Sequence, residues 1–246
     1  MDRLIFTAYS GMTGSHVRER VIASNMANAQ TIGFRAETLS FSPMTLKGPS
    51  LEARAMTSGE VKGASMKQGA VVQTGGALDI ALTGRDLLAI QTEDGGEAYT
   101  RRGDLSLSPT GVLQNGDGRP VIGQNGPVTV PVGSRVSIGP DGSVLVANPA
   151  TPDVPPLALD KLKIASPAGS KVAKDLDGFF RVEGGGVLPA NEDARVLTGS
   201  LEQSNVDPTQ VLVEMVEAQR LFDIRTKVIA TARDIDEGGT SLMRLT

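Results

Sequence analysis

The chain has 246 residues, a net charge of −4, one histidine and no cysteine. The lack of cysteine and of a second histidine argues against a disulfide scaffold, a zinc site and a Cys/His catalytic pair. The acidic balance argues against a dedicated nucleic-acid binder, and no apolar run approaches the roughly 18 residues that a membrane-spanning helix needs.

Glycine and proline are concentrated in the middle of the chain. Residues 1–42 contain no proline, no proline follows Pro208, and residues 200–237 contain no glycine. Because helix interiors tolerate these two residue types least, the distribution predicts a helix at each end and a β-rich middle.

The expected N-terminal helix carries apolar residues at alternating spacings of four and three. This spacing, kept over about four repeats, is typical of a coiled-coil seam. The seam can pack within one chain or between chains, and the sequence favours neither. Its members are Met1, Ile5, Ala8, Met12, Ile22, Met26 and Ala29.

After an expected extended connector at residues 36–77, residues 78–198 alternate between short apolar runs and turn pairs such as Asn125-Gly126 and Asp141-Gly142. Many short strands at intervals of roughly 8–12 residues predict an antiparallel sandwich or barrel. The expected strands are 78–83, 87–91, 98–101, 105–107, 121–122, 128–130, 136–138, 144–146, 162–164, 179–182 and 195–197.

The expected C-terminal helix begins at a capping-box-like sequence, in which Asp207 caps the helix and Gln210 stands three residues later. Apolar residues then recur at helical spacing, and Gly238-Gly239 would end or interrupt the helix. The predicted fold class is therefore α+β, in which the long N- and C-terminal helices form a coiled-coil-like bundle beside a central antiparallel, sandwich- or barrel-like domain.

No enzyme site emerges from the sequence. His16 lies among charged residues without an acid or nucleophile partner, and we interpret Arg101-Arg102 as part of a solvated surface. Paired carboxylates of the kind that glycoside hydrolysis needs are not placed together by any motif. We predict no catalytic residue, no cofactor and no metal, and a carbohydrate-active enzyme is a remote alternative.

Four segments resemble a known family. Residues 23–35 read ASNMANAQTIGFR and are similar to the N-terminal signature of bacterial flagellar rod and hook proteins, from which they depart at Ser24 and Ile32. Residues 78–84 (LDIALTG) and 99–105 (YTRRGDL) match the central pattern of that family. Residues 199–207 (GSLEQSNVD) are similar to its closing motif. The matches come in order and span nearly the whole chain.

The resemblance implies a structural protein of the basal-body rod, most like a proximal-rod member, with a distal-rod member as the alternative. It implies helical polymerisation into a drive shaft that spans the periplasm and lines the export channel. Its partners would be copies of itself, other rod proteins and the flagellar export apparatus, which it would pass without a cleaved signal peptide. A trimeric phage-tail or adhesin fibre is the alternative from another class.

In this family the ends of the chain form an inner, axial domain. We therefore expect residues 1–35 and 199–246 to be axial, 36–77 to connect, and 78–198 to form the outer domain. The expected assembly interface comprises Ile5, Ala8, Met12, Ile22, Asn25, Asn28, Gly33, Phe34, Leu201, Asn205, Val211, Met215, Ala218, Arg220, Phe222 and Ile229.

Overall fold

The computed structural model describes residues 2–47, 52–149, 154–175 and 177–243. The chain divides into two compact units, which are described separately. The helical unit comprises Met1–Ala27, Glu37–Gly63 and Asp207–Thr246, and the β-rich unit comprises Asn28–Ala36 and Ala64–Val206.

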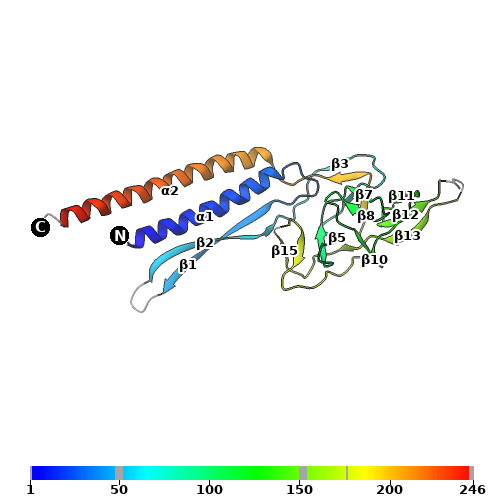
Figure 1. The fold of residues 1–246 in the computed structure, drawn as a ribbon, viewed down its shortest axis with the longest axis horizontal. Helices are drawn as coiled ribbons and strands as arrows, with labels where there is room; N and C mark the ends of the chain where they lie inside the picture. The colour runs from blue at the N-terminus through cyan, green and yellow to red at the C-terminus, as the bar shows by residue number, and fades with distance from the viewer. Residues whose placement is uncertain (1, 48–51, 150–153, 176, 244–246) are drawn as a thin grey trace. The chain divides into compact units, whose positions relative to one another are not determined.

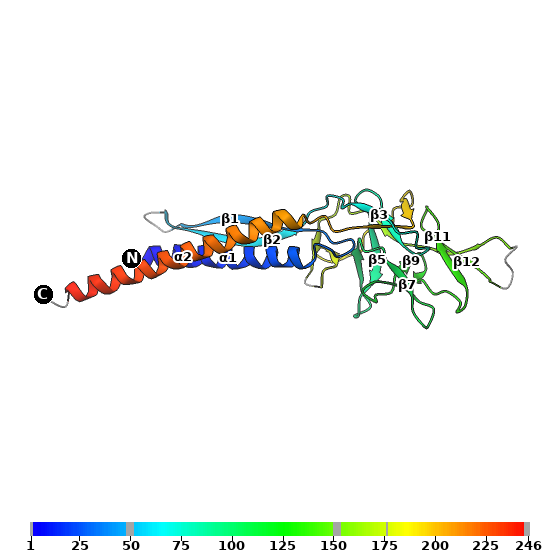
Figure 2. The same ribbon diagram turned by 90° about the horizontal axis from the view of Figure 1, so that it is seen from above.

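The helical unit contains one helix from each end of the chain and a pair of strands. Helix α1 (Asp2–Ala27) and helix α2 (Pro208–Met243) lie side by side and run in opposite directions (Figures 1 and 2). Strands β1 (Glu37–Lys47) and β2 (Glu52–Ala64) form a two-stranded sheet, and β1 packs against α1. The Asn25 side chain fixes this packing, because its amide donates to the Glu37 carbonyl at 3.1 Å and its oxygen accepts from the Glu37 N–H at 2.8 Å.

Helix α2 begins where the sequence predicts. The Asp207 carboxylate accepts hydrogen bonds from the backbone N–H groups of Thr209 at 2.8 Å and Gln210 at 3.3 Å, which satisfies two of the free donors at a helix start. The capping box is only half formed, because the Gln210 side chain donates to Glu214 instead of turning back. The helix continues through Gly238 to Met243, so the expected stop was wrong. A glycine costs only about 1 kcal/mol in a helix interior, which weakens a helix without ending it.

The β-rich unit consists of short strands joined by turns. In chain order they are β3 (Val71–Gln73), β4 (Ile80–Leu82), β5 (Leu87–Gln91), β6 (Glu97–Thr100), β7 (Leu105–Leu107), β8 (Leu113–Asn115), β9 (Ile122–Gly123), β10 (Gly126–Pro127), β11 (Arg135–Ile138), β12 (Ser143–Ala147), β13 (Leu157–Lys161), β14 (Ile164–Ala165), β15 (Val172–Lys174), β16 (Phe180–Val182), β17 (Val196–Thr198) and β18 (Ser200–Glu202).

The largest sheet has the strand order β14-β5-β6-β16-β15, and a second sheet has the order β11-β12-β13. The other strands pair in twos, among them β17 with β4 and β18 with β3. Two apolar clusters fill the interior: a large one that includes Leu82, Leu88 and Ile90, and a smaller one around Tyr99 and Phe180. Within the smaller cluster, the Leu188 N–H donates to the Tyr99 hydroxyl at 2.6 Å, so the buried phenol has a partner.

The predicted fold class was wrong. The described residues form two helices and many short strands in small sheets, and they form no coiled-coil-like bundle and no single sandwich or barrel. A coiled-coil seam needs continuous matched apolar side chains. Where α1 and α2 meet, Arg225 of α2 instead donates to the Gly11 carbonyl and the Ser15 hydroxyl of α1. The strands are too short and too often interrupted by turns to build one closed sheet.

Candidate assembly site

The contact between the two helices is extensive but partly polar. Arg225 lies across Gly11, where a Cβ would lie 3.5 Å from Arg225 Nε, an ordinary van der Waals distance, so this contact does not require glycine. Nearby, the His16 ring packs edge-on against Phe222 with the centroids 5.2 Å apart. The His16 side chain remains 63% exposed.

Helix α2 leaves a series of large apolar side chains exposed. They are between 47% and 58% accessible, although isolated soluble domains bury most of their large aliphatic residues. Repeated along one helix, such side chains are candidates for contact with another molecule. They are Leu212, Val213, Val216, Ile224, Val228 and Ile235.

The structure places the expected helix residues at three levels of burial. Ile22, Val211 and Ala218 are buried in the helical unit, with 4%, 7% and 3% of their surfaces exposed. Half-buried positions are Met12, Met215, Phe222 and Ile229, whereas Arg220 is exposed. The side chains of Ile5 and Ala8 lie outside the described residues.

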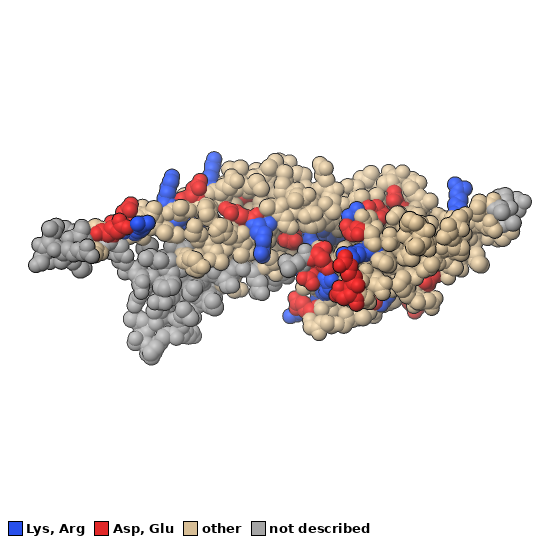
Figure 3. All heavy atoms as spheres, in the orientation of Figure 1, with Lys and Arg blue, Asp and Glu red and all other residues tan. Residues whose placement is uncertain are grey.

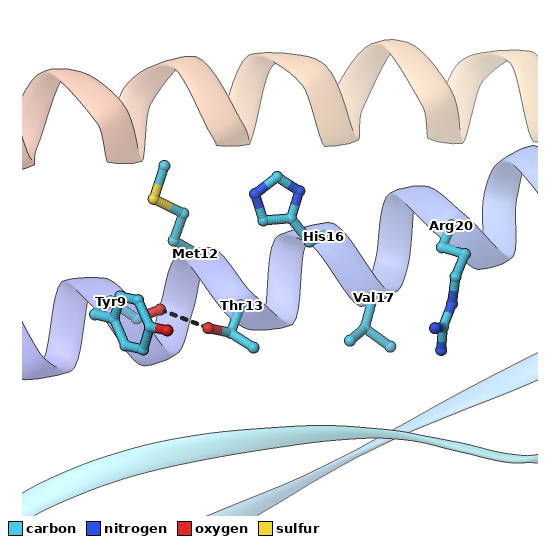
Figure 4. Close-up of a pocket in the computed structure, with 6 residues that line it drawn as sticks. All are labelled: Tyr9, Met12, Thr13, His16, Val17 and Arg20. Carbon is cyan, nitrogen blue, oxygen red and sulfur yellow. Dashed lines mark hydrogen bonds between the residues drawn. The ribbon is translucent and has the colours of Figure 1, made fainter.

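A shallow hollow of about 500 Å³ lies along α1 (Figure 4). Met12 and His16 point toward α2, whereas Tyr9, Val17 and Arg20 point away from it. Thr13 also lines the hollow and donates to the Tyr9 carbonyl at 3.1 Å. The residues that line it include no carboxylate and no nucleophile with a neighbouring base. They therefore form no recognisable catalytic arrangement.

A second hollow, of about 520 Å³, lies within the β-rich unit beside Met66, Arg85 and Phe180. Asp86, which also lines it, accepts a hydrogen bond from Asn191 at 3.0 Å. Within the described residues, no group of three or more His, Cys, Asp or Glu side chains could hold a metal ion. In the same residues, no helix has the length and apolar character to cross a bilayer.

Apart from Asn25, which lies in α1 of the helical unit, the expected site residues from the signature segments belong to the β-rich unit. Gly33 requires its residue type, because its φ is +68° and a Cβ would lie 2.4 Å from the Arg101 carbonyl carbon. Its N–H donates to the Glu202 carbonyl at 2.8 Å. The Lys174 ammonium lies 3.5 Å from the centroid of the Phe34 ring. These contacts join the N-terminal signature to strands β15 and β18 and to the residue after β6.

Asn205 fastens three backbone segments. Its side-chain oxygen accepts from the Ala36 N–H at 2.7 Å, and its amide donates to the carbonyls of Ser65 at 3.1 Å and Lys67 at 2.7 Å. Leu201 is 7% exposed on β18, opposite Val72 of β3. Within the N-terminal signature, the Thr31 hydroxyl donates to the half-buried Asn28 side chain at 3.1 Å. The structure therefore shows contacts within the chain for each of these signature residues.

Sequence reasoning missed a buried ionic cluster at this junction. Arg35 and Arg101 have fully buried side chains, and both contact the carboxylate of Glu202, which is 1% exposed. The expectation that Arg101 lies on a solvated surface was wrong. The signal available in the sequence was the position of Glu202 in a strand beside the apolar Leu201, but its partners lie more than 100 residues away in the chain.

The charged surface carries no broad basic face in the view of Figure 3. Basic and acidic side chains are interspersed along the helical unit, and acidic side chains gather on one part of the β-rich unit.

Comparisons with known proteins agree with the resemblance of the signature segments. The family model described as the C-terminal region of the flagellar basal body rod FlgEFG proteins matches residues 197–242. The model described as the D1 domain of the flagellar hook protein FlgE/F/G matches residues 81–146.

Full-length relatives extend these matches over almost the whole chain. The chain is 38% identical to the flagellar basal-body rod protein FlgF of Salmonella typhimurium, over 97% of this chain and 96% of that protein. It is 37% identical to FlgF of Escherichia coli over 95% of each chain. It is also 32% identical to the rod protein FlgG of Bacillus subtilis over 99% of this chain and 100% of that protein.

Proposed function

The chain belongs to the family of flagellar basal-body rod proteins, and on that premise we propose that its copies assemble through the exposed apolar side chains of α2. It is a structural subunit of the rod, similar to FlgF, and not an enzyme. It is located in the flagellar basal body and associates with other rod proteins. The observation that carries the proposal is the row of half-exposed aliphatic side chains on α2.

In the proposed assembly, these side chains of each α2 pack against a different surface of the next subunit. A contact between unlike surfaces repeats without closing, so it produces a helical array instead of a closed oligomer. The ends of the chain, residues 1–35 and 199–246, would form the axial part of the array and residues 78–198 the outer part. The apolar α2 surface supports this arrangement because water contact with it is unfavourable in a free subunit.

We place the subunit in the proximal part of the rod, with its copies spanning the periplasm around the export channel. It would reach this position through the flagellar export apparatus without a cleaved signal peptide. The identity of 38% and 37% to the FlgF proteins of Salmonella typhimurium and Escherichia coli, against 32% to FlgG of Bacillus subtilis, supports the proximal position.

The decisive experiment introduces a charge into the exposed apolar row. Leu212→Asp or Val216→Asp should leave the folded subunit intact, because each side chain is 48% exposed. Either change should stop rod assembly and swimming, because the carboxylate would be buried without a partner at a subunit contact. Exposed positions are preferable to Met215 and Phe222, which are half-buried within the chain's own helical unit.

The matched control is Ser106→Asp, which places the same charge at an exposed polar position of β7, outside α2. This variant should assemble and support swimming. Rods of normal length in cells that carry Leu212→Asp or Val216→Asp would contradict the proposed surface.

A further inference from the structure

The β-rich unit encloses more positive than negative charge at one point. The guanidinium groups of Arg35 and Arg101 are 0% exposed, and the single carboxylate between them belongs to Glu202. Glu202 Oε1 lies 2.7 Å from Arg35 Nη2, and Glu202 Oε2 accepts a hydrogen bond from Arg101 Nε at 2.9 Å and another from Arg101 Nη2. The cluster therefore holds two cations and one anion away from water.

The remaining contacts of the cluster are with neutral backbone groups. Arg101 donates to the carbonyls of Leu82 at 2.8 Å and Asp86 at 2.6 Å, and Arg35 donates to the Lys67 carbonyl. Arg35 Nε is buried without a hydrogen-bond partner among the described residues. The pKa of Arg35 is lowered to about 10, first by burial and then by the charge of Arg101, against which Glu202 acts. Arg35 is therefore the less well satisfied of the two cations.

The three charges come from the two ends and the middle of the β-rich unit. Arg35 is the last residue of the N-terminal signature, Arg101 follows strand β6, and Glu202 ends strand β18. Glu202 Oε1 also accepts the Gly69 N–H at 2.8 Å, so the same carboxylate holds a fourth segment. Long-range contacts of this kind form only after the intervening chain has been ordered.

We infer that Glu202 is the closing residue of the β-rich unit, whose native state becomes stable only when the C-terminal segment brings this carboxylate between Arg35 and Arg101. Before that, folding of the earlier strands would bury two cations that repel one another. The unit then folds as one cooperative whole. A chain from which residue 202 has not yet emerged contains no stable β-rich unit.

The test compares charge-removing variants of the full-length chain by hydrogen exchange. Glu202→Gln keeps nearly the same side-chain volume and removes the anion. We expect the amides throughout the β-rich unit, including those of β5 and β6, to lose protection together by about 10²–10³-fold. The control Glu183→Gln removes an exposed carboxylate of the same unit and should leave protection unchanged.

A second pair of variants separates charge imbalance from the loss of hydrogen bonds. Arg35→Met leaves one buried cation with one anion, so it should be less harmful than Glu202→Gln. The double variant Glu202→Gln/Arg35→Met should be more protected than Glu202→Gln alone, because only one buried cation remains. If Glu202→Gln does not fold at all, folding of the double variant still shows that the excess buried positive charge destabilises the β-rich unit.

Three results would overturn the inference. They are a loss of protection restricted to the neighbourhood of β18, equal protection in Glu202→Gln and Glu183→Gln, and a double variant no more protected than the single one. The inference concerns the isolated chain and does not depend on the proposed assembly, since rod formation through α2 can succeed or fail independently of it.

Discussion

The two units of the chain differ in how much fully buried apolar core they contain, although both leave large aliphatic side chains exposed, such as Val132 and Leu157 of the β-rich unit. Strands β4 and β5 of the β-rich unit contribute Leu82, Leu88 and Ile90, each fully buried. Among the described side chains of the helical unit, the buried apolar residues are Val21, Ile22, Val211 and Ala218, and each keeps between 3% and 7% of its surface exposed. The same unit leaves six large aliphatic side chains of α2 about half exposed.

This difference separates the structural roles of the two units. Long helices take most of their stability from packing an apolar face, and the apolar face of α2 is only partly packed within the chain. The β-rich unit, in contrast, has interior clusters and a buried ionic junction of its own. We interpret the β-rich unit as complete in the free subunit and the helical unit as completed by its neighbours.

The largest expected effect comes from shortening the same residue type in the two units. Leu88→Ala, at a position with 0% exposure, should lower the free energy of unfolding by about 2–5 kcal/mol, because it leaves a cavity. Leu212→Ala, at a position with 48% exposure, should change it by no more than about 0.5 kcal/mol in the free subunit. Urea unfolding followed by far-ultraviolet circular dichroism measures both.

Equal losses in these two variants would break the comparison, because α2 would then be packed as well as β5. A loss in Leu212→Ala that appears only in assembled rods would sharpen it, since the side chain would then be shown to pack between subunits.

Local signals in the sequence predicted the helices and many strands. The absence of proline from residues 1–42 and of glycine from residues 200–237 predicted the helical ends, and Asp207 caps α2 as expected. The expected strand at 87–91 is β5, and the one at 105–107 is β7. These features depend on residues close together in the chain, where spacing and turn residues carry the information.

Pairing between distant residues could not be predicted in the same way. The spacing of Val211 and Ala218 indicates an apolar helix face, but it does not say that Arg225 occupies the contact with α1. The charge of Arg101 is visible in the sequence, whereas its burial depends on Glu202, 101 residues later. The signature residues Asn25 and Asn205 were expected at an assembly interface, and the structure shows the contacts that each makes within the chain.

The next effect compares those two asparagines, each of which fastens backbone groups in a different unit. Asn205→Ala removes hydrogen bonds to Ala36, Ser65 and Lys67 and should lower the free energy of unfolding of the β-rich unit by about 1–3 kcal/mol. Asn25→Ala removes two bonds to Glu37 and should cost about 0.5–1.5 kcal/mol. Hydrogen exchange should show a loss over the whole β-rich unit for Asn205→Ala and a loss limited to α1 and β1 for Asn25→Ala. A global loss in the Asn25 variant would mean that the helical unit is as cooperative as the β-rich one.

The smallest effect concerns acid and two turns of the β-rich unit. Hydrogen bonds from the Ser143 hydroxyl and N–H lower the pKa of Asp141 below 3.8. Burial opposes ionisation of Asp177, but Arg181 and the Phe179 N–H outweigh it and lower its pKa below 3.8 as well. Because these pKa values are lower in the folded than in the unfolded chain, the stability that they provide is complete above about pH 5 and is lost as the pH falls through the unfolded-state and then the folded-state values.

Acid should therefore weaken the β-rich unit through these turns while its apolar clusters remain packed. The urea midpoint of the β-rich unit should fall between about pH 5 and about pH 3, and Asp177→Asn should reduce this fall. A variant with the same acid sensitivity as the unchanged protein would show that the turn carboxylates add nothing. The stability of the β-rich unit would then rest on its apolar clusters and its buried ionic junction. Its contrast with the helical unit, which has few buried apolar side chains, would become sharper.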